Sequence, residues 1–336
     1  MPQHFIDSNE VIDTIYFGGG TPSLLTSGEL SAIMEIVYKK FSVNPSVEIT
    51  LEANPDDINS TVVSDWVGLG INRVSLGVQS FNEEELKWMN RAHNALEAKN
   101  SIDILLNGSI SNLSVDLIFG GPLLSDEILI NNLETIIEKK IPHLSCYALT
   151  VEEKTALHKS IQLKKSMNVE GEKQARHFDL VAEVLSQATY EQYEISNYAL
   201  EGHRSKHNSS YWKGKAYYGF GPSAHSFNGE KKRRWNVANN SLYIKQILSG
   251  IIPYEEEVLS TSQQMNEFIM ISLRTKEGIQ LEHFEKKFGL NSKNNLIKAV
   301  QPFVADKKIT IQDEHILLTN EGKLFADGIA SALFEI

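Results

Sequence analysis

The stretch VIDTIYFGGGTPSLL, residues 11–25, runs from an apolar segment directly into three glycines, a threonine and a proline. A short run rich in β-branched and aromatic residues that ends in glycine is typical of a buried strand followed by a turn. Consecutive glycines present peptide N–H and C=O groups without Cβ atoms, so a ligand can approach the backbone closely. The stretch therefore predicts a strand whose carboxyl end lies beside a bound molecule.

Strand-like and helix-like segments alternate through the residues that follow. Helical patterns such as Ala95 to Asn107 lie between strand patterns at VEITLEANP (47–55), RVSLGVQS (73–80), LSVDLIFGGP (113–122), HLSCYALT (143–150) and YEQYEISNYA (190–199). This alternation is typical of βα units around a parallel sheet, and a barrel is the natural way to close such a sheet. The sequence predicts an α/β fold built on a barrel or partial barrel.

Composition narrows the classes of function. The formal net charge of −11 argues against a nucleic-acid or anionic-membrane binder, because both need a basic face. No apolar run approaches the ~20 residues of a membrane span, and the N-terminus lacks a signal-peptide layout, so we expect a cytoplasmic protein without stable membrane insertion. Cys146 is the single cysteine, which excludes an internal disulfide and a site with several cysteine ligands.

Polar residues or glycines stand at the carboxyl end of each predicted strand. In a parallel barrel these ends meet at one face, where active sites lie. Loops after strands are polar in any case, but that alternative does not explain why the acids Glu52 and Asp116 fall inside the strand patterns. Neither GxxxxGK nor GxGxxG, the usual phosphate-binding loops, is present. The backbone carbonyls of the glycine-rich turn can bind an ammonium group, and Glu52 can accept hydrogen bonds from ribose hydroxyls. This combination favours a nucleoside that carries an amino acid as the ligand.

Several blocks resemble, in order, the radical S-adenosylmethionine family of oxygen-independent coproporphyrinogen oxidases and HemW-type haem chaperones. These are YFGGGTPSLL (16–25), LEANPDD (51–57), LGVQSFNEEELKWMNRAH (76–93), SVDLIFGGP (114–122) and YALTVEEKTAL (147–157). The resemblance covers nearly the whole chain. It implies a partial (β/α) barrel of the radical SAM type, followed by a winged-helix-like α+β domain.

The resemblance also implies a set of site residues for S-adenosylmethionine. The methionine amino group would meet the glycine-rich turn, Glu52 would bind the ribose, and Arg91 would pair with the ligand carboxylate through its planar fork. A surface charge at a helix end is the alternative for Arg91. The full set is Gly19, Gly20, Thr21, Glu52, Gln79, Arg91, Asp116 and Ala148.

One feature departs from the family pattern. Members carry C-x-x-x-C-x-x-C after the first barrel strand, and those thiolates hold a 4Fe-4S cluster. The chain has only Cys146, inside an apolar strand pattern where a small buried side chain is the simpler interpretation. We expect that the first strand and helix of the family's barrel are missing and that this chain cannot start radical chemistry.

The segment HNSSYWKG, residues 207–214, resembles the H-N-x-x-Y-W motif of HemW-type haem chaperones. The resemblance implies His207 as a candidate haem-iron ligand, and Tyr211 and Trp212 offer flat surface to a porphyrin. A hydrogen-bonded structural histidine is the alternative. His225, in YYGFGPSAHSF (217–227), is a second possible ligand, and the basic run KKRRW (231–235), on an expected loop, could meet porphyrin propionates or solvent.

The last eighty or so residues are typical of three helices and a hairpin that turns at Asp313 and Glu314. Such winged-helix-like modules often bind DNA, but no basic helix is visible, and the resemblance implies a cover over the barrel mouth. We therefore expect three parts: a radical SAM partial barrel over 1–205, an HNxxYW haem-binding and connecting region over 206–255, and a HemN-type domain over 256–336.

Three functions compete at this point. The first is a haem chaperone that binds haem and S-adenosylmethionine and passes haem to an acceptor protein, for which HNSSYW is the distinguishing feature. The second is an oxygen-independent coproporphyrinogen III oxidase, which decarboxylates propionate side chains through a radical. The third is a barrel without radical chemistry that acts as a binding module.

Overall fold

The structure is a computed structural model and describes residues 10–153, 155–163 and 166–334. The chain divides into two compact units, one of Val11–His207 and one that contains Asn208–Ile336 together with Glu10.

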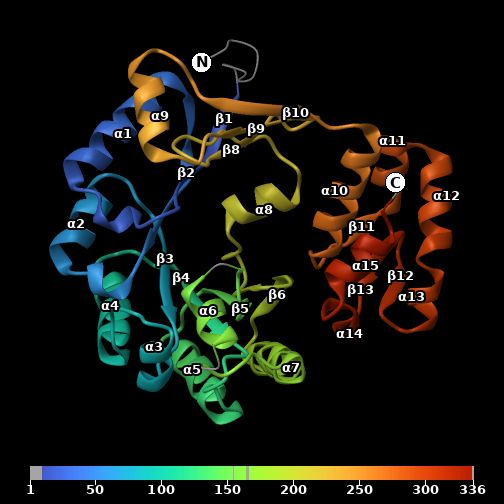
Figure 1. Cartoon of the computed structure of the whole chain (residues 1–336), viewed down its shortest axis with the longest axis horizontal. Coiled ribbons are helices and arrows are strands. Elements are labelled where there is room, and N and C mark those ends of the chain that lie inside the picture. The colour runs from blue at the N-terminus through green and yellow to red at the C-terminus, as the bar shows by residue number, and fades with distance from the viewer. Residues whose placement is uncertain (1–9, 154, 164–165, 335–336) are drawn as a thin grey trace. The chain divides into compact units, whose positions relative to one another are not determined.

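The unit of Val11–His207 is a curled sheet with helices on its outer side (Figure 1). Among the described residues the sheet has seven strands in the order β1-β2-β3-β4-β5-β7-β6. The strands are β1 (Val11–Phe17), β2 (Ser42–Ala53), β3 (Arg73–Gln79), β4 (Asn112–Phe119), β5 (His143–Ala148), β6 (Glu191–Glu194) and β7 (Asn197–Ala199). β1 to β5 are parallel, whereas β7 and β6 continue the sheet antiparallel. The predicted partial barrel is confirmed.

The helices of this unit follow the strands as the sequence predicts. They are α1 (Ser27–Lys40), α2 (Ser60–Gly68), α3 (Glu83–Trp88), α4 (Ala95–Asn107), α5 (Asp126–Glu138), α6 (Ala156–Gln162) and α7 (Gly171–Gln187). Capping boxes begin two of them: Thr26 and Glu29 at α1, and Asn94 and Glu97 at α4. These reciprocal hydrogen bonds satisfy N–H groups that a helix start leaves without partners, which fixes where each helix begins.

Side chains of the central strands alternate between the two faces of the sheet, apart from register shifts in β1 and β3. On β3, Val74, Leu76 and Val78 are fully buried, and comparable apolar side chains of β2 and β4 join them. The residues between them are polar, and they contact one another from strand to strand, as Tyr16 with Glu52 and Ser114 with His143 do. Since successive side chains of a strand point to opposite faces, the apolar set packs under the outer helices. The polar set lies on the concave face.

The second unit contains two small sheets and a group of helices. The sheet β10-β9-β8 is followed by a module with its own apolar core around Ile269, Phe284 and Ile316. The elements are α8 (Lys206–Trp212, which begins in the first unit), β8 (His225–Phe227), β9 (Lys232–Asn236), α9 (Asn240–Leu248), β10 (Tyr254–Val258), α10 (Thr261–Leu273), β11 (Ile279–Gln280), α11 (Leu281–Phe288), α12 (Leu290–Ala299), α13 (Gln301–Ala305), β12 (Ile309–Gln312), β13 (His315–Leu318), α14 (Asn320–Lys323) and α15 (Ala326–Ala332).

The C-terminal module has the predicted winged-helix-like character. Its strands form a sheet in the order β11-β13-β12, and the hairpin turns at Asp313 and Glu314, which have positive φ angles of 47° and 61°. That pair of left-handed residues is typical of a two-residue turn matched to the twist of a hairpin. The predicted third helix is divided into α12 and α13. Pro302, at the start of α13, has no N–H to continue the helical ladder.

One local expectation is wrong. The sequence suggests a loop for the basic run that begins at Lys231, but Lys232–Asn236 form β9, which pairs antiparallel with the glutamate-rich β10. Across the two strands Arg233 pairs with Glu257 and Arg234 with Glu256, and Arg233 Nη2 also lies 2.8 Å from Glu267 Oε2 on α10. Cross-strand pairs of opposite charge stabilise neighbouring strands, so these arginines are held by carboxylates of the chain itself.

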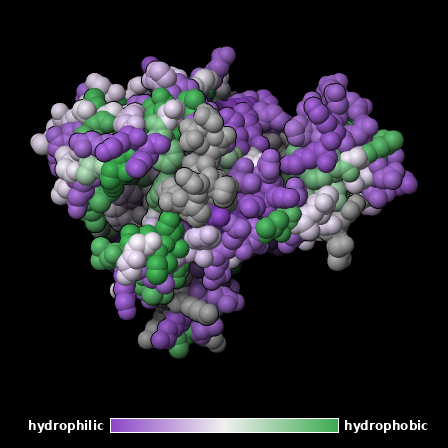
Figure 2. Space-filling model, turned by 90° about the horizontal axis from the view of Figure 1, so that it is seen from above, coloured by the Kyte–Doolittle hydropathy of each residue, from purple (hydrophilic) through white to green (hydrophobic). Residues whose placement is uncertain are grey.

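Figure 2 shows hydrophobic side chains in separate patches on one face, with mostly hydrophilic ones over the C-terminal module. In the part of the chain that the structure describes, no helix combines the length and apolar character needed to cross a bilayer.

The outer apolar face of the sheet should dominate the stability of the barrel unit. We expect Leu76→Ala, at a side chain with 0% exposure, to lower the free energy of unfolding by about 2–5 kcal/mol, because it removes apolar contacts and leaves a cavity. Leu96→Ala, at a side chain that is 66% exposed on α4, is the control and should change stability by about 0.5 kcal/mol or less. Urea unfolding followed by circular dichroism measures both; equal effects would contradict the assignment of Leu76 to the core.

Candidate functional site

The glycine-rich turn after β1 is tied to Glu52 on the neighbouring strand. Gly19 N–H donates to Glu52 Oε2 over 3.1 Å, and the Tyr16 hydroxyl donates to Glu52 Oε1 over 2.8 Å. Gly19 and Gly20 have φ angles of +78° and +67°, which side chains rarely allow. A Cβ on Gly18 would come within 2.6 Å of the Tyr16 ring. The glycines therefore let the chain turn beside a carboxylate whose two oxygens are both oriented.

A second group forms around Arg91, at the carboxyl ends of β2 and β3. Arg91 Nη2 donates to Asn54 Oδ1 over 2.8 Å and to the Gly77 carbonyl over 3.0 Å. Its Nε is buried and has no hydrogen-bond partner among the described residues, and burial lowers the pKa of the guanidinium. Gln79 has a φ of 68°, an uncommon value for a residue with a side chain. Arg91 is thus fixed through Nη2, while its buried Nε has no partner among the described residues.

Asp116 lies on the concave face of β4. The Ser75 hydroxyl donates to Asp116 Oδ1 over 3.3 Å. Burial raises the pKa of Asp116 to about 6, and the neighbouring Glu52 contributes in the same direction, while Ser145 and Arg73 oppose the rise. Asp116 therefore exchanges its proton near neutral pH, unlike an ordinary aspartate.

The structure brings the predicted nucleoside-site residues to one edge of the sheet. Glu52 and Gly19 are joined directly, and a Cβ added at Gly77 would lie 3.1 Å from Gln79 Nε2 and 3.5 Å from Arg91 Nη2. The remaining predicted residues stand at the ends of β1 and β5: Gly20, Thr21 and Ala148.

His207 belongs to the barrel unit and is held on its concave face. Its Nδ1 lies 2.8 Å from Thr14 Oγ1, and its ring stacks on Tyr16 with centroids 4.6 Å apart and planes at 23°. The N–H groups of His207 and Lys206 donate to the buried carboxylate of Glu48 over 3.0 and 3.2 Å. Burial, with a contribution from Arg73, lowers the pKa of His207 to about 4. At neutral pH its imidazole is therefore uncharged, the form that ligates metals.

The two aromatic residues that follow in the same motif make other contacts. Tyr211 packs edge-on against Tyr217 with centroids 4.7 Å apart, and the guanidinium of Arg274 lies 5.6 Å from the Trp212 ring centroid. Both contacts lie within the second unit. The suggestion that Tyr211 and Trp212 receive a porphyrin together with His207 stays a prediction.

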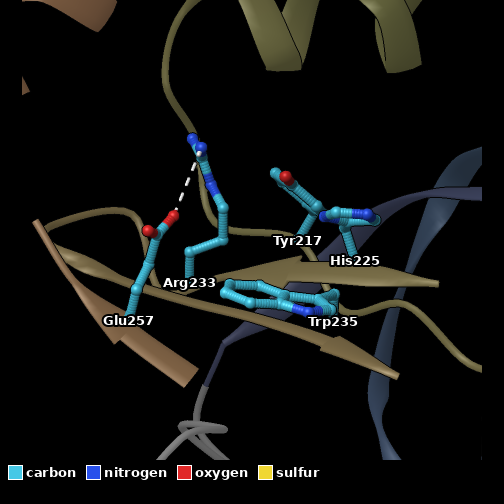
Figure 3. Close-up of a pocket in the computed structure, with 5 residues that line it drawn as sticks. All are labelled: Tyr217, His225, Arg233, Trp235 and Glu257. Atoms are coloured by element: carbon cyan, nitrogen blue, oxygen red, sulfur yellow. Dashed lines mark ion pairs between the residues drawn. The ribbon is translucent and has the colours of Figure 1, made fainter. Parts of the chain in front are cut away.

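The second unit contains a pocket of about 410 Å³ lined by Tyr217, His225, Arg233, Trp235 and Glu257. Figure 3 shows the rings of Tyr217, His225 and Trp235 together and the Arg233 side chain turned toward Glu257. The His225 and Trp235 rings stack with centroids 6.3 Å apart. Arg233 pairs with Glu257 in the pocket and with Glu267, which is not among the lining residues, so its charge is already matched by carboxylates. Ligation by His225 stays a prediction.

Sequence reasoning did not select Tyr16, although this side chain connects the two candidate ligand groups. Its hydroxyl binds Glu52 and its ring supports His207. It also did not select Thr14, Ser75 or Arg73. The signal that could have identified them is the alternation in β1 to β4, where polar residues recur at about every second position and so share one face of the sheet.

The residues do not fit a 4Fe-4S cluster, which thiolates usually hold. Cys146, the single cysteine of the sequence, lies on the outer face of β5 with 3% exposure, and burial raises the pKa of its thiol. Within the described residues no group of three or more histidines, cysteines or acids is arranged to hold a metal ion.

Comparison with known proteins gives two family matches. Residues 5–136 match the radical SAM superfamily, and residues 259–325 match the HemN C-terminal domain. The haem chaperone HemW of Lactococcus lactis is 31% identical over 93% of this chain and 82% of its own length. HemW of Bacillus subtilis is 31% identical over 96% of this chain and 85% of its own length.

Among solved structures, the radical SAM enzyme coproporphyrinogen III oxidase (HemN) of Escherichia coli superimposes with a TM-score of 0.82. The match covers 96% of this chain and 78% of HemN, at 19% sequence identity. At that identity the likeness concerns the fold: the curled half-barrel and the C-terminal module.

The raised pKa of Asp116 predicts a pH dependence of stability. Its pKa is about 6 when folded and near 3.8 when unfolded, so the folded state resists ionisation and stability falls as pH rises from about 4 to about 6. A difference of two pKa units corresponds to about 3 kcal/mol. Part of that loss occurs below pH 4.5, so we expect Asp116→Asn to reduce the loss of stability between pH 4.5 and pH 7.5 by about 2 kcal/mol. Asp103→Asn, at an exposed aspartate, is the control; the same pH profile in both variants would refute the assignment.

Proposed function

Because the chain belongs to the HemW family of the radical SAM superfamily, we propose that it binds haem and S-adenosylmethionine and delivers haem to an acceptor protein. The observation that carries the proposal is His207, a neutral imidazole fixed by Thr14 and Tyr16 on the concave face of the barrel unit. The HemW proteins of Lactococcus lactis and Bacillus subtilis align with most of the length of this chain.

The residues at the carboxyl ends of β1 to β4 fit S-adenosylmethionine. The Glu52 carboxylate can accept from ribose hydroxyls, and Gly19 and Gly20 leave open space where a Cβ would stand. Arg91 has a buried Nε without a partner among the described residues, which suits the two oxygens of an amino-acid carboxylate. These groups bind and orient the ligand. We derive no radical step, because the chain supplies no set of cysteines for a cluster.

The geometry at His207 fits a haem ligand. Metal-bound histidines usually hydrogen-bond through the nitrogen that does not touch the metal, and Nδ1 of His207 has Thr14 as that partner. Stacking on Tyr16 fixes the plane of the imidazole. Its lowered pKa means that no proton must leave before iron binds at neutral pH.

The coproporphyrinogen oxidase alternative has less support. The named oxidase shares the fold at 19% identity, whereas the named chaperones reach 31%.

His207→Ala should weaken haem binding by about 10-fold or more and shift the Soret band, because the iron loses its imidazole. Absorbance titration of the purified protein with haem measures both, and added free imidazole should restore the band. His158→Ala, on α6, is the control and should bind as the wild type does. Unchanged affinity and spectrum in His207→Ala would refute the assignment of His207, and a band lost only in His225→Ala would move the assignment to His225.

Arg91→Lys should weaken S-adenosylmethionine binding by about 10-fold, because an ammonium cannot match two carboxylate oxygens as a guanidinium fork does. Binding of 5'-methylthioadenosine, which has the nucleoside but no amino-acid carboxylate, is the matched control and should be equal in the two proteins. Calorimetric titration measures each affinity. Equal losses for both ligands would show that Arg91 supports the fold rather than the carboxylate.

A further inference from the structure

Four side chains form a row across the concave face of the sheet. The strand register pairs Tyr16 with Thr50, Thr50 with Arg73, and Arg73 with Asn112. Paired residues of parallel neighbours point to the same face. The row therefore begins at Tyr16, on which His207 stacks, and reaches Arg73 two strands away. It ends at Asn112, the first residue of β4.

Arg73 has the features of an anion-binding group. It is 2% exposed, which is rare for an arginine, and its Nε has no hydrogen-bond partner in the described part of the chain. Thr50 Oγ1 and Asn112 Oδ1, its neighbours in the row, are also buried without partners there. A buried charge normally has an opposite charge and hydrogen bonds to offset its desolvation. Asp116 attracts Arg73 electrostatically, but these three buried atoms have no hydrogen bonds among the described residues.

The acids of the concave face are engaged elsewhere. Glu48 accepts from the N–H groups of Lys206 and His207, and Glu52 accepts from Tyr16 and Gly19. Asp116 accepts from the Ser75 hydroxyl, and it attracts Arg73 without forming an ion pair with it. None of the ion pairs between described residues includes Arg73.

The distance along the row fits a flat ligand with acidic arms. Tyr16 and Arg73 are two strand spacings apart, or ~10 Å. That is comparable to the separation between the iron of a haem and its propionate carboxylates. His207, on Tyr16, lies at the iron end of this span, and Arg73 lies at the carboxylate end.

We propose that Arg73 and Thr50 form a carboxylate-binding site on the concave face that takes a propionate of a haem ligated by His207. The guanidinium fork would bind the two carboxylate oxygens, with the Thr50 hydroxyl as a further donor. This site rests on the proposed function. It is separate from Arg91, whose fixed contacts are Asn54 and Gly77.

The test compares haem with its dimethyl ester, which keeps the iron and the ring but has no free carboxylate. Both are titrated into the full-length wild type, Arg73→Gln, Arg73→Lys and the control Arg176→Gln, an exposed arginine on α7. Wild type and the control should prefer haem over the ester by about 10-fold, as expected for a charged hydrogen-bonded pair. Arg73→Gln should lose the preference while keeping the Soret signature of ligation, and Arg73→Lys should keep part of it.

The outcomes separate the two proposals. If the wild type binds neither compound, the proposed function fails and this site fails with it. If it binds both with equal affinity, haem binding stands and the carboxylate site is refuted; this arm needs no variant to fold. If Arg73→Gln still prefers haem over the ester, or loses the same affinity for both compounds, Arg73 does not bind a propionate. The buried arginine then serves the fold or contacts water, and the assignment is overturned.

Discussion

The pleat of the parallel strands is the constraint on which the rest of the barrel unit depends. Successive side chains must point to opposite faces, so each strand with a period of two supplies one apolar face and one polar face. Val74, Leu76 and Val78 are buried under the helices, while Arg73 and Ser75 lie on the concave face. Because the two sets alternate along each strand, packing of the apolar side chains under the helices also fixes which polar groups meet on the concave face.

Burial of polar side chains on the concave face shifts their pKa values. Burial lowers the pKa of His207 and raises that of Asp116, and in both cases it favours the uncharged form. The cost is offset by hydrogen bonds between strands, such as Tyr16 to Glu52 and Ser75 to Asp116. Arg73 is buried there with no partner for its Nε in the described part of the chain. A polar interior of this kind is suited to binding rather than to stability alone.

Tyr16 gives the two candidate ligand groups a shared support. Its hydroxyl orients Glu52 beside the glycine turn, and its ring orients His207. One side chain thus contacts both Glu52, proposed to bind the ribose, and His207, proposed to ligate the iron. The second unit contributes its own aromatic pocket and a compact C-terminal module with an apolar core of its own.

The one strand expected over residues 190–199 is the two antiparallel strands β6 and β7. The sequence by itself determined the parallel strands, most of the helices, the partial barrel, the C-terminal module and the polar residues at the strand ends. Local patterns suffice for these features, because capping residues, glycines and hydrophobic periods act over a few positions. Only the tertiary structure decided that His207 stacks on Tyr16, that Arg73 shares a row with Thr50, and that the expected loop at Lys232 is a strand paired with glutamates. Those relations join residues far apart in the chain, and strand register and sheet curvature, which local sequence does not encode, bring them together.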